Sequence, residues 1–118
     1  MLDTTPLLDA AERFADTLRG APQSRLARGA AAEGLTLARE LARRAQLLEE
    51  PGREPVTMPD AGLFAVADQV LVAATDLAEA LRTAPERDPG GAGAAAGGDD
   101  AVDEAVDAIR TAKRRAFP

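Results

Sequence analysis

The chain has 118 residues, a formal net charge of −6, and no histidine, cysteine, tryptophan or tyrosine. Without imidazole or thiol groups, the sequence excludes a histidine base, a cysteine nucleophile, a disulfide and a Cys/His zinc or haem site. Ser24 is the only serine and Lys113 the only lysine. We therefore expect a protein that is not an enzyme and that carries no cofactor and no metal ion.

The supply of large apolar side chains is small. Apolar residues make up 46% of the chain, but 28 of its 118 residues are alanine. Small domains depend most on apolar burial, so a private core would be thin. All but one of the 14 basic residues are arginine, which together with abundant alanine and glycine is typical of a GC-rich bacterial genome.

The first residues lack the basic flank and apolar run of a signal peptide, and no stretch approaches the ~20 apolar residues of a membrane span. We therefore expect a cytoplasmic protein with no membrane contact.

Apolar residues recur at helical spacing along the chain, which predicts an all-α protein with four helices and no strand. The first helix is expected to begin at Thr5-Pro6, an N-cap residue followed by proline at the first helical position. Gly20-Ala21-Pro22 is expected to end it.

The second helix is expected over about residues 22–50, with Leu37 and Leu41 on its apolar stripe. Two glycines, Gly29 and Gly34, lie inside it, although glycine costs roughly 1 kcal/mol relative to alanine in a helix. Small residues there favour a continuous helix that another element crosses closely. A break near residue 30 is the alternative.

The third helix has the clearest pattern. Thr57-Met58-Pro59-Asp60 is typical of a capping box, and Pro85 is expected to close the helix. Phe64 and Leu71 widen an apolar face whose main residues are spaced 4-3-4-3-4, as in an antiparallel bundle seam: Leu63, Ala67, Val70, Ala74, Leu77 and Leu81.

The composition divides the chain into three parts. Residues 1–84 are expected to form a helical bundle domain, residues 85–98 a flexible Gly/Ala/Pro-rich linker, and residues 99–118 a C-terminal amphipathic helix. Acidic residues precede basic ones along this last helix, an order that complements the helix dipole. Its apolar face contains Val102, Val106 and Ile109.

Helix lengths of about 40 Å for the second and third segments predict an antiparallel helical hairpin with a short turn. The first and last helices could cover this hairpin, or two hairpins could meet in a dimeric four-helix core. The high alanine content favours the second arrangement, so we expect a homodimer. Its helix seam would consist of Leu37, Leu41, Leu63, Val70, Leu77 and Leu81. For the last helix we expect docking on its own chain, with a partner protein or a membrane surface as alternatives.

An arginine stripe on the second helix is the first candidate partner surface. It would oppose the leucine stripe and contain Arg25, Arg28, Arg39 and Arg43. Such a row could bind nucleic acid or an acidic protein. The net charge of −6 and the scarcity of aromatic residues favour a solvated helix face instead.

Two further sets of residues lie outside the apolar stripes. Glu33 and Arg44 flank the stripe of the second helix, where they would form an ion pair at the core edge or serve as a polar anchor for a ligand. Leu35, Leu47, Val66 and Val72 are expected to point outward, and they would mark a protein interface if they cluster in space.

These observations predict a non-enzymatic protein-interaction module, a small adaptor or regulator that acts through helix packing and self-association. One alternative is a small-molecule-binding bundle with an apolar cavity between the second and third helices, anchored by Glu33 or Arg44. The other, weaker alternative is a nucleic-acid-associated regulator that uses the arginine stripe.

Overall fold

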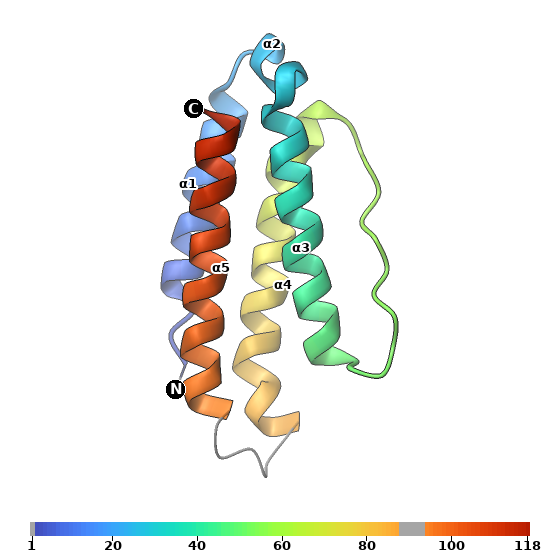
Figure 1. Ribbon diagram of the computed structural model, residues 1–118, viewed down its shortest axis with the longest axis vertical. Helices are drawn as coiled ribbons and strands as arrows, with labels where there is room; N and C mark the ends of the chain where they lie inside the picture. Colours follow the sequence, from blue (N-terminus) through green and yellow to red (C-terminus); the bar gives the residue numbers. More distant parts are fainter. Residues whose placement is uncertain (1, 88–93) are drawn as a thin grey trace.

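The computed structural model describes residues 2–87 and 94–118, which form a bundle of four long helices without strands (Figure 1). The all-α bundle predicted from the sequence is confirmed. None of the described helices is both long and apolar enough to cross a membrane. The elements in chain order are α1 (Thr5–Gly20), α2 (Gln23–Arg25), the π-helical turn η1 (Leu26–Ala30), α3 (Ala31–Glu49), the 3-10 turn η2 (Leu63–Ala65), α4 (Val66–Arg87) and α5 (Ala94–Ala116).

The connection between α3 and α4, residues 50–62, runs back along the whole length of α3 (Figure 1). Gln46 binds the backbone of Val56, and Arg39, two turns earlier in α3, donates from Nε to the carbonyl of Met58 at 2.8 Å. Helix α4 therefore starts again at the end where α3 began. The expected antiparallel hairpin is wrong in this respect, because α3 and α4 run parallel, with α1 and α5 opposed to both (Figure 1).

The capping-box pattern lies in this connection rather than at a helix start. The Oδ1 atom of Asp60 accepts a hydrogen bond from the backbone N–H of Gly62 at 2.8 Å. Gly62 has φ of 98°, which side-chain-bearing residues rarely adopt. Asp60 thus closes a turn, as aspartate commonly does, and the helix begins at Leu63 instead of near Thr57.

Two glycines shape the start of α3 in different ways. Gly29 has φ of 151° and interrupts the helix between α2 and α3, so the expected continuous helix is wrong and the break near residue 30 is what the structure contains. The close crossing expected nearby is confirmed at Gly34. A Cβ atom there would lie 2.5 Å from Cγ1 of Val66 and 3.3 Å from Cδ1 of Leu18.

The N-terminus is held by short polar contacts. Thr4 precedes α1 as its cap residue, one position earlier than expected. The backbone N–H of Thr5 donates to Oδ1 of Asp3 at 3.0 Å, and hydrogen bonds from the Thr5 side chain and backbone lower the pKa of the Asp3 carboxyl. The buried hydroxyl of Thr4 accepts a hydrogen bond from Arg82 of α4 at 2.8 Å, which ties the beginning of the chain to the end of α4.

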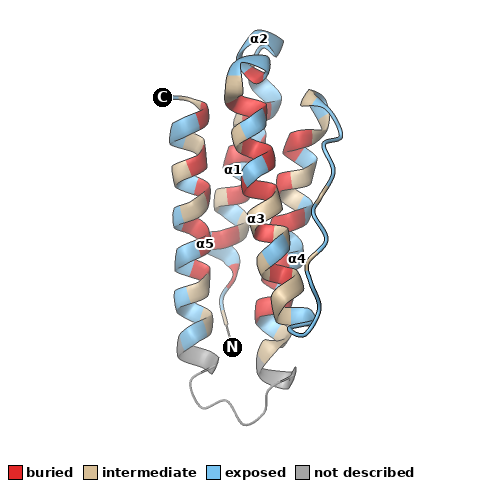
Figure 2. Cartoon of the chain, turned by 45° about the vertical axis from the view of Figure 1, so that its right-hand side comes forward, coloured by how far each residue is buried: buried red, intermediate tan, exposed pale blue. Residues whose placement is uncertain are grey.

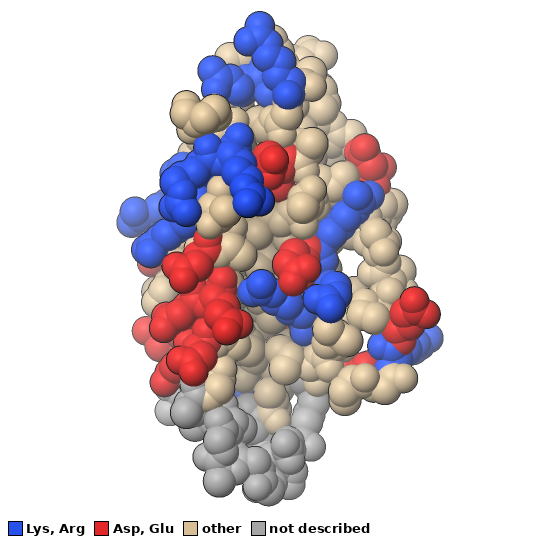
Figure 3. Space-filling model, in the orientation of Figure 1, with Lys and Arg blue, Asp and Glu red and all other residues tan. Residues whose placement is uncertain are grey.

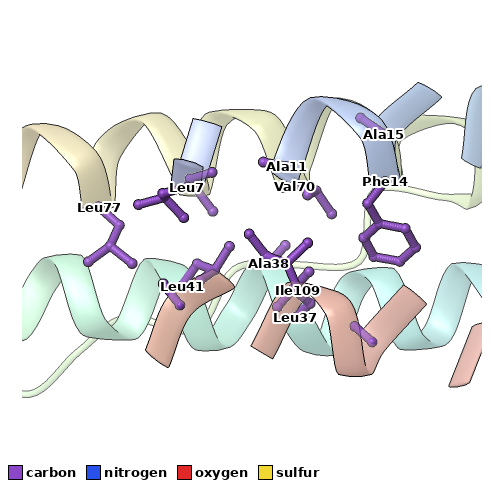
Figure 4. Close-up of a cluster of buried hydrophobic side chains, with 14 of the residues drawn as sticks. Leu7, Ala11, Phe14, Ala15, Leu37, Ala38, Leu41, Val70, Leu77 and Ile109 are labelled. Atoms are coloured by element: carbon purple, nitrogen blue, oxygen red, sulfur yellow. The ribbon is translucent and has the colours of Figure 1, made fainter. Parts of the chain in front are cut away.

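Each long helix buries one side in the bundle and exposes the other (Figure 2). Charged side chains lie on the outside (Figure 3), and Thr4 is the single buried polar residue among those described. Leu7, Phe14, Leu41, Leu77 and Ile109 are fully buried and come from α1, α3, α4 and α5, so one interior forms within one chain (Figure 4). Alanines let the helices approach closely around these side chains: Ala11, Ala15, Ala38, Ala73, Ala74, Ala78, Ala80 and Ala105.

The C-terminal helix packs on its own chain, mainly against α1 and α3. Its apolar residues Val102, Val106 and Ile109 are buried, as expected. After α5, the ring of Phe117 meets Phe14 of α1 edge-on, with centroids 6.5 Å apart. This contact fixes the C-terminal end of α5 to the bundle.

The helix boundaries around the expected linker differ from the prediction. Helix α4 continues past Pro85 to Arg87, and α5 begins at Ala94, five residues before the expected Asp99. Residues 88–93 of the expected linker lie outside the described residues.

Candidate functional site

A shallow groove of about 470 Å³ runs between α3 and α5. Leu37, Ala108 and Ala112 form part of its lining, together with the hydroxyl-bearing Thr36 and Thr111. Six charged side chains surround it: Glu33, Glu40, Arg44, Glu104, Asp107 and Arg115. The groove therefore has an apolar base and a charged rim with more carboxylates than guanidinium groups.

The two sequence-predicted polar anchors, Glu33 and Arg44, both line this groove. Arg44 donates from Nε to Oε1 of Glu40 at 3.1 Å, and Arg43 lies 3.5 Å from the same oxygen. Glu33, by contrast, makes no ion pair with another described residue. The α5 residues that line the other side of the groove could not be identified from the sequence, because nothing in it indicates that α5 lies beside α3.

The small-molecule alternative predicted an apolar cavity between the second and third helices. Between α3 and α4, the space is filled by side chains such as Leu41, Val70 and Leu77, all buried. Within the described residues, His, Cys, Asp and Glu form no group of three or more that could hold a metal ion.

The predicted arginine stripe is divided by the kink at Gly29. Arg25 and Arg28 are exposed before the kink. Beyond it, Arg39 binds the carbonyl of Met58, and Arg43 lies near Glu40. The kink thus separates Arg25 and Arg28 from Arg39 and Arg43, and the four guanidinium groups do not form one continuous row.

Two of the four residues expected to point outward are buried. Leu35 is 8% exposed and Val66 is 2% exposed, so the prediction is wrong for both. Val66 covers Gly34 at the crossing of α3 and α4. A helix in a four-helix bundle contacts two neighbouring helices, so residues on both sides of its main apolar stripe are buried as well. Leu47 is half-buried.

The fourth residue, Val72, is exposed and belongs to an apolar patch at the start of α4. Phe64 is 76% exposed and Val72 is 56% exposed. Leu71 is half-buried beside them. Helical spacing places these residues on one side, with Asp68 between Phe64 and Val72, and we call them the α4 outer face. Helical spacing predicted that Phe64 widens the buried apolar face of the third helix, whereas its ring is exposed in the structure.

The expected helix seam lies inside the single chain. Its residues Leu37, Leu41, Val70, Leu77 and Leu81 are buried among α1, α3, α4 and α5, and Leu63 is half-buried at the start of η2. These side chains belong to the core of one chain in the structure.

No family model, no curated protein and no solved structure matches this chain. A function can therefore be argued only from its own residues.

Proposed function

We propose that this protein is a non-enzymatic protein-interaction module that acts through helix packing and self-association, in the cytoplasm expected from the sequence. One chemical observation supports the non-enzymatic part of the proposal. Thr4 is the single buried polar residue among those described, and its hydroxyl accepts a hydrogen bond from Arg82. The pKa values of catalytic groups are commonly shifted by burial, whereas no charged side chain of the described residues is buried.

The exposed ring of Phe64 carries the proposal for a protein partner. Aromatic side chains supply large contact area and are frequent anchors of protein interfaces. On the α4 outer face the neighbouring carboxylate of Asp68 is already paired, because Arg19 donates to its Oδ1 at 2.6 Å. With Val72 next along the helix, the face offers an apolar contact beside a neutralised charge.

A photo-crosslinking experiment tests this proposal. A p-benzoylphenylalanine residue in place of Phe64, in the full chain expressed in its native cells, is expected to give a discrete protein adduct after illumination. The adduct should weaken when Val72→Asp is introduced into the same chain, because a charge then enters the apolar contact. Mass spectrometry identifies the crosslinked protein.

The matched control carries the same photoreactive residue at Glu12, which is exposed on α1. Equal adduct patterns from positions 64 and 12, unaffected by Val72→Asp, would show that the α4 outer face is not a specific binding surface. Val72→Asp should leave the free energy of unfolding within about 0.5 kcal/mol of the parent, because Val72 is 56% exposed, so a weaker adduct cannot be attributed to unfolding.

The α3–α5 groove supports a second candidate function, the binding of a small polar molecule. Its support is the convergence of Glu33 and Arg44 on one depression of about 470 Å³. Because carboxylates outnumber arginines around it, a small organic cation is the expected ligand class. Ligand-observed NMR with a set of small ammonium compounds tests this candidate. Binding should be lost in Glu33→Gln and kept in Glu49→Gln, an exposed carboxylate outside the groove.

A further inference from the structure

Helix α5 carries nine charged side chains in two blocks. The acidic block comes first along the helix and the basic block second: Asp99, Asp100, Asp103, Glu104 and Asp107, then Arg110, Lys113, Arg114 and Arg115. All are exposed except the half-buried Lys113. In Figure 3 the two blocks form adjoining red and blue areas over the position of α5.

The helix dipole explains only one of the two blocks. Lys113, Arg114 and Arg115 lie in the last turn, where positive charge is favourable. The first turn, however, contains no acidic residue, because α5 begins at Ala94 and Asp99 follows five residues later. Since the effect of the dipole falls off within the first turn, it does not account for the acidic block.

The charged residues of α5 form no ion pair with any other described residue. The ion pairs among the described residues involve α1, α3, α4 and the connection, and none includes a residue of either block. Arg114 makes one hydrogen bond, to the hydroxyl of Thr111 at 3.1 Å. Like charges also stand four residues apart, Asp103 with Asp107 and Arg110 with Arg114, a spacing that is unfavourable in an isolated helix.

The same four residues form a regular stripe. Asp103, Asp107, Arg110 and Arg114 are spaced 4-3-4, so they lie along one line of the helix surface. The buried residues Ala105, Ile109 and Ala112 lie on the opposite side. The stripe has two acids at one end and two bases at the other, so it is complementary to itself when its direction is reversed.

We propose that the outward face of α5 is a self-association surface that takes a second copy of this chain, with the two α5 helices antiparallel across a two-fold axis. The inference rests on the proposed function, of which self-association is a part, and it names the surface and the partner. In a two-fold interface every contact occurs twice. Asp107 of each copy then faces Arg110 of the other, and Asp103 faces Arg114.

The four side chains of the stripe give four ion pairs across the two-fold axis, since each of the two contacts occurs twice. Carboxylate and guanidinium groups form strong, directional hydrogen bonds when they meet. The interface therefore consists of ion pairs, which makes dimerisation sensitive to ionic strength.

Sedimentation equilibrium of the full chain at two salt concentrations is the first test. At 0.02 M NaCl and pH 7 a dimer is expected. In 1 M NaCl, where charges are screened within about 3 Å, the dissociation constant should rise at least tenfold. A dimer held by apolar contacts would persist in 1 M salt, and that result would overturn the proposal.

Charge-reversal variants give the sharper test. The acid-to-base variant Asp103→Arg/Asp107→Arg and the base-to-acid variant Arg110→Asp/Arg114→Asp should each be monomeric at 0.02 M NaCl, because like charges then face each other. Mixed in equal amounts, the two variants should form a heterodimer. The variant with all four substitutions is again self-complementary and should recover the homodimer.

The control Glu49→Arg/Glu54→Arg makes the same change in net charge as the acid-to-base variant, at exposed positions away from α5, and its dimer should persist at low salt. Circular dichroism checks that each variant keeps its helix content. A parent chain that is monomeric at 0.02 M salt overturns the proposal and leaves the face to another protein. A dimer unaffected by any α5 variant overturns it as well. A monomeric parent chain also removes self-association from the proposed function. Crosslinking at Phe64 is independent of both results, so failure here is distinguishable from failure of the α4 outer face.

Discussion

Gly29 and Gly34 lie five positions apart and are required for different physical reasons. At Gly29 the reason is the backbone, because φ is 151° while an added Cβ would meet nothing within 4 Å. At Gly34 the reason is steric, because an added Cβ atom would lie 2.5 Å from Cγ1 of Val66 and 3.3 Å from Cδ1 of Leu18. The local sequence, with glycine at both positions, does not distinguish the two roles, since one depends on a kink and the other on a neighbouring helix.

Gly34→Ala should lower the free energy of unfolding by about 1–3 kcal/mol, although alanine has the higher helix propensity, because its Cβ overpacks the crossing with Val66. Urea denaturation followed by circular dichroism measures the change. Gly20→Ala, where a Cβ meets nothing within 4 Å, serves as the control and should stay within about 0.5 kcal/mol of the parent. Adding Val66→Ala to Gly34→Ala should cost less than the sum of the two changes, because the clash is relieved. Full additivity would contradict the close crossing.

At the scale of elements, the connection between α3 and α4 decides how the helices are paired. Polar side chains of the helices hold its backbone: Gln46 at Val56, Arg39 at Met58 and Gln69 at Pro59, with distances of 2.8 to 3.0 Å. The side-chain amide of Gln46 donates to one backbone group of Val56 and accepts from the other. These contacts hold an otherwise irregular segment along α3.

Gln46→Ala should therefore loosen the connection without unfolding the helices. Loss of three hydrogen bonds, two with Val56 and one to the carbonyl of Ala42, partly compensated by water, is expected to cost about 1 kcal/mol of stability. Hydrogen exchange followed by NMR should show faster exchange of the Val56 amide, whereas amides of the α3 interior near Leu41 keep their protection. Gln23→Ala, at an exposed glutamine on α2, should change neither quantity. Unchanged exchange at Val56 in Gln46→Ala would contradict the tether.

The late start of α4 also explains why the predicted antiparallel hairpin is wrong. Thr57 and Asp60 have the residue types and the spacing of a capping box, and the same residue types are equally suited to turns. The turn at Gly62 delays the helix to Leu63 and leaves a connection long enough to return along α3. The short connection predicted from Pro51 onward would have allowed only an antiparallel hairpin.

For the whole molecule, one interior is shared by all four long helices. Phe14 of α1 contacts Phe117 beyond α5, and Ile109 of α5 is buried with Leu37 and Leu41 of α3 (Figure 4). The small supply of large side chains is offset by alanines, which bring the backbones close enough for efficient packing. Without α5, this interior would lose one of its walls.

A truncated chain of residues 1–87 should therefore lose its cooperative thermal unfolding transition and bind a hydrophobic dye. Adding a peptide of residues 94–118 should restore the transition, because α5 then docks on α1 and α3. Differential scanning calorimetry measures the transition, and a scrambled peptide of equal composition is the control. A truncated chain that unfolds as cooperatively as the full chain would mean that α1, α3 and α4 form a complete core alone.

The sequence by itself determined which segments are helical and which side of each is apolar. Helical periodicity is local, so the buried residues Val70, Leu77, Val102 and Ile109 could be assigned from neighbouring positions alone. It also determined the order of charges along α5, with acidic residues before basic ones.

Only the tertiary structure decided how the helices are arranged. The parallel course of α3 and α4, the burial of Leu35 and Val66, and the groove that joins Glu33 to α5 all depend on contacts between residues far apart in the chain. Such contacts follow from the path of one irregular connection and from the close approach at Gly34. Local residue patterns do not specify them, because the same apolar stripe can pack against any neighbouring helix of suitable shape.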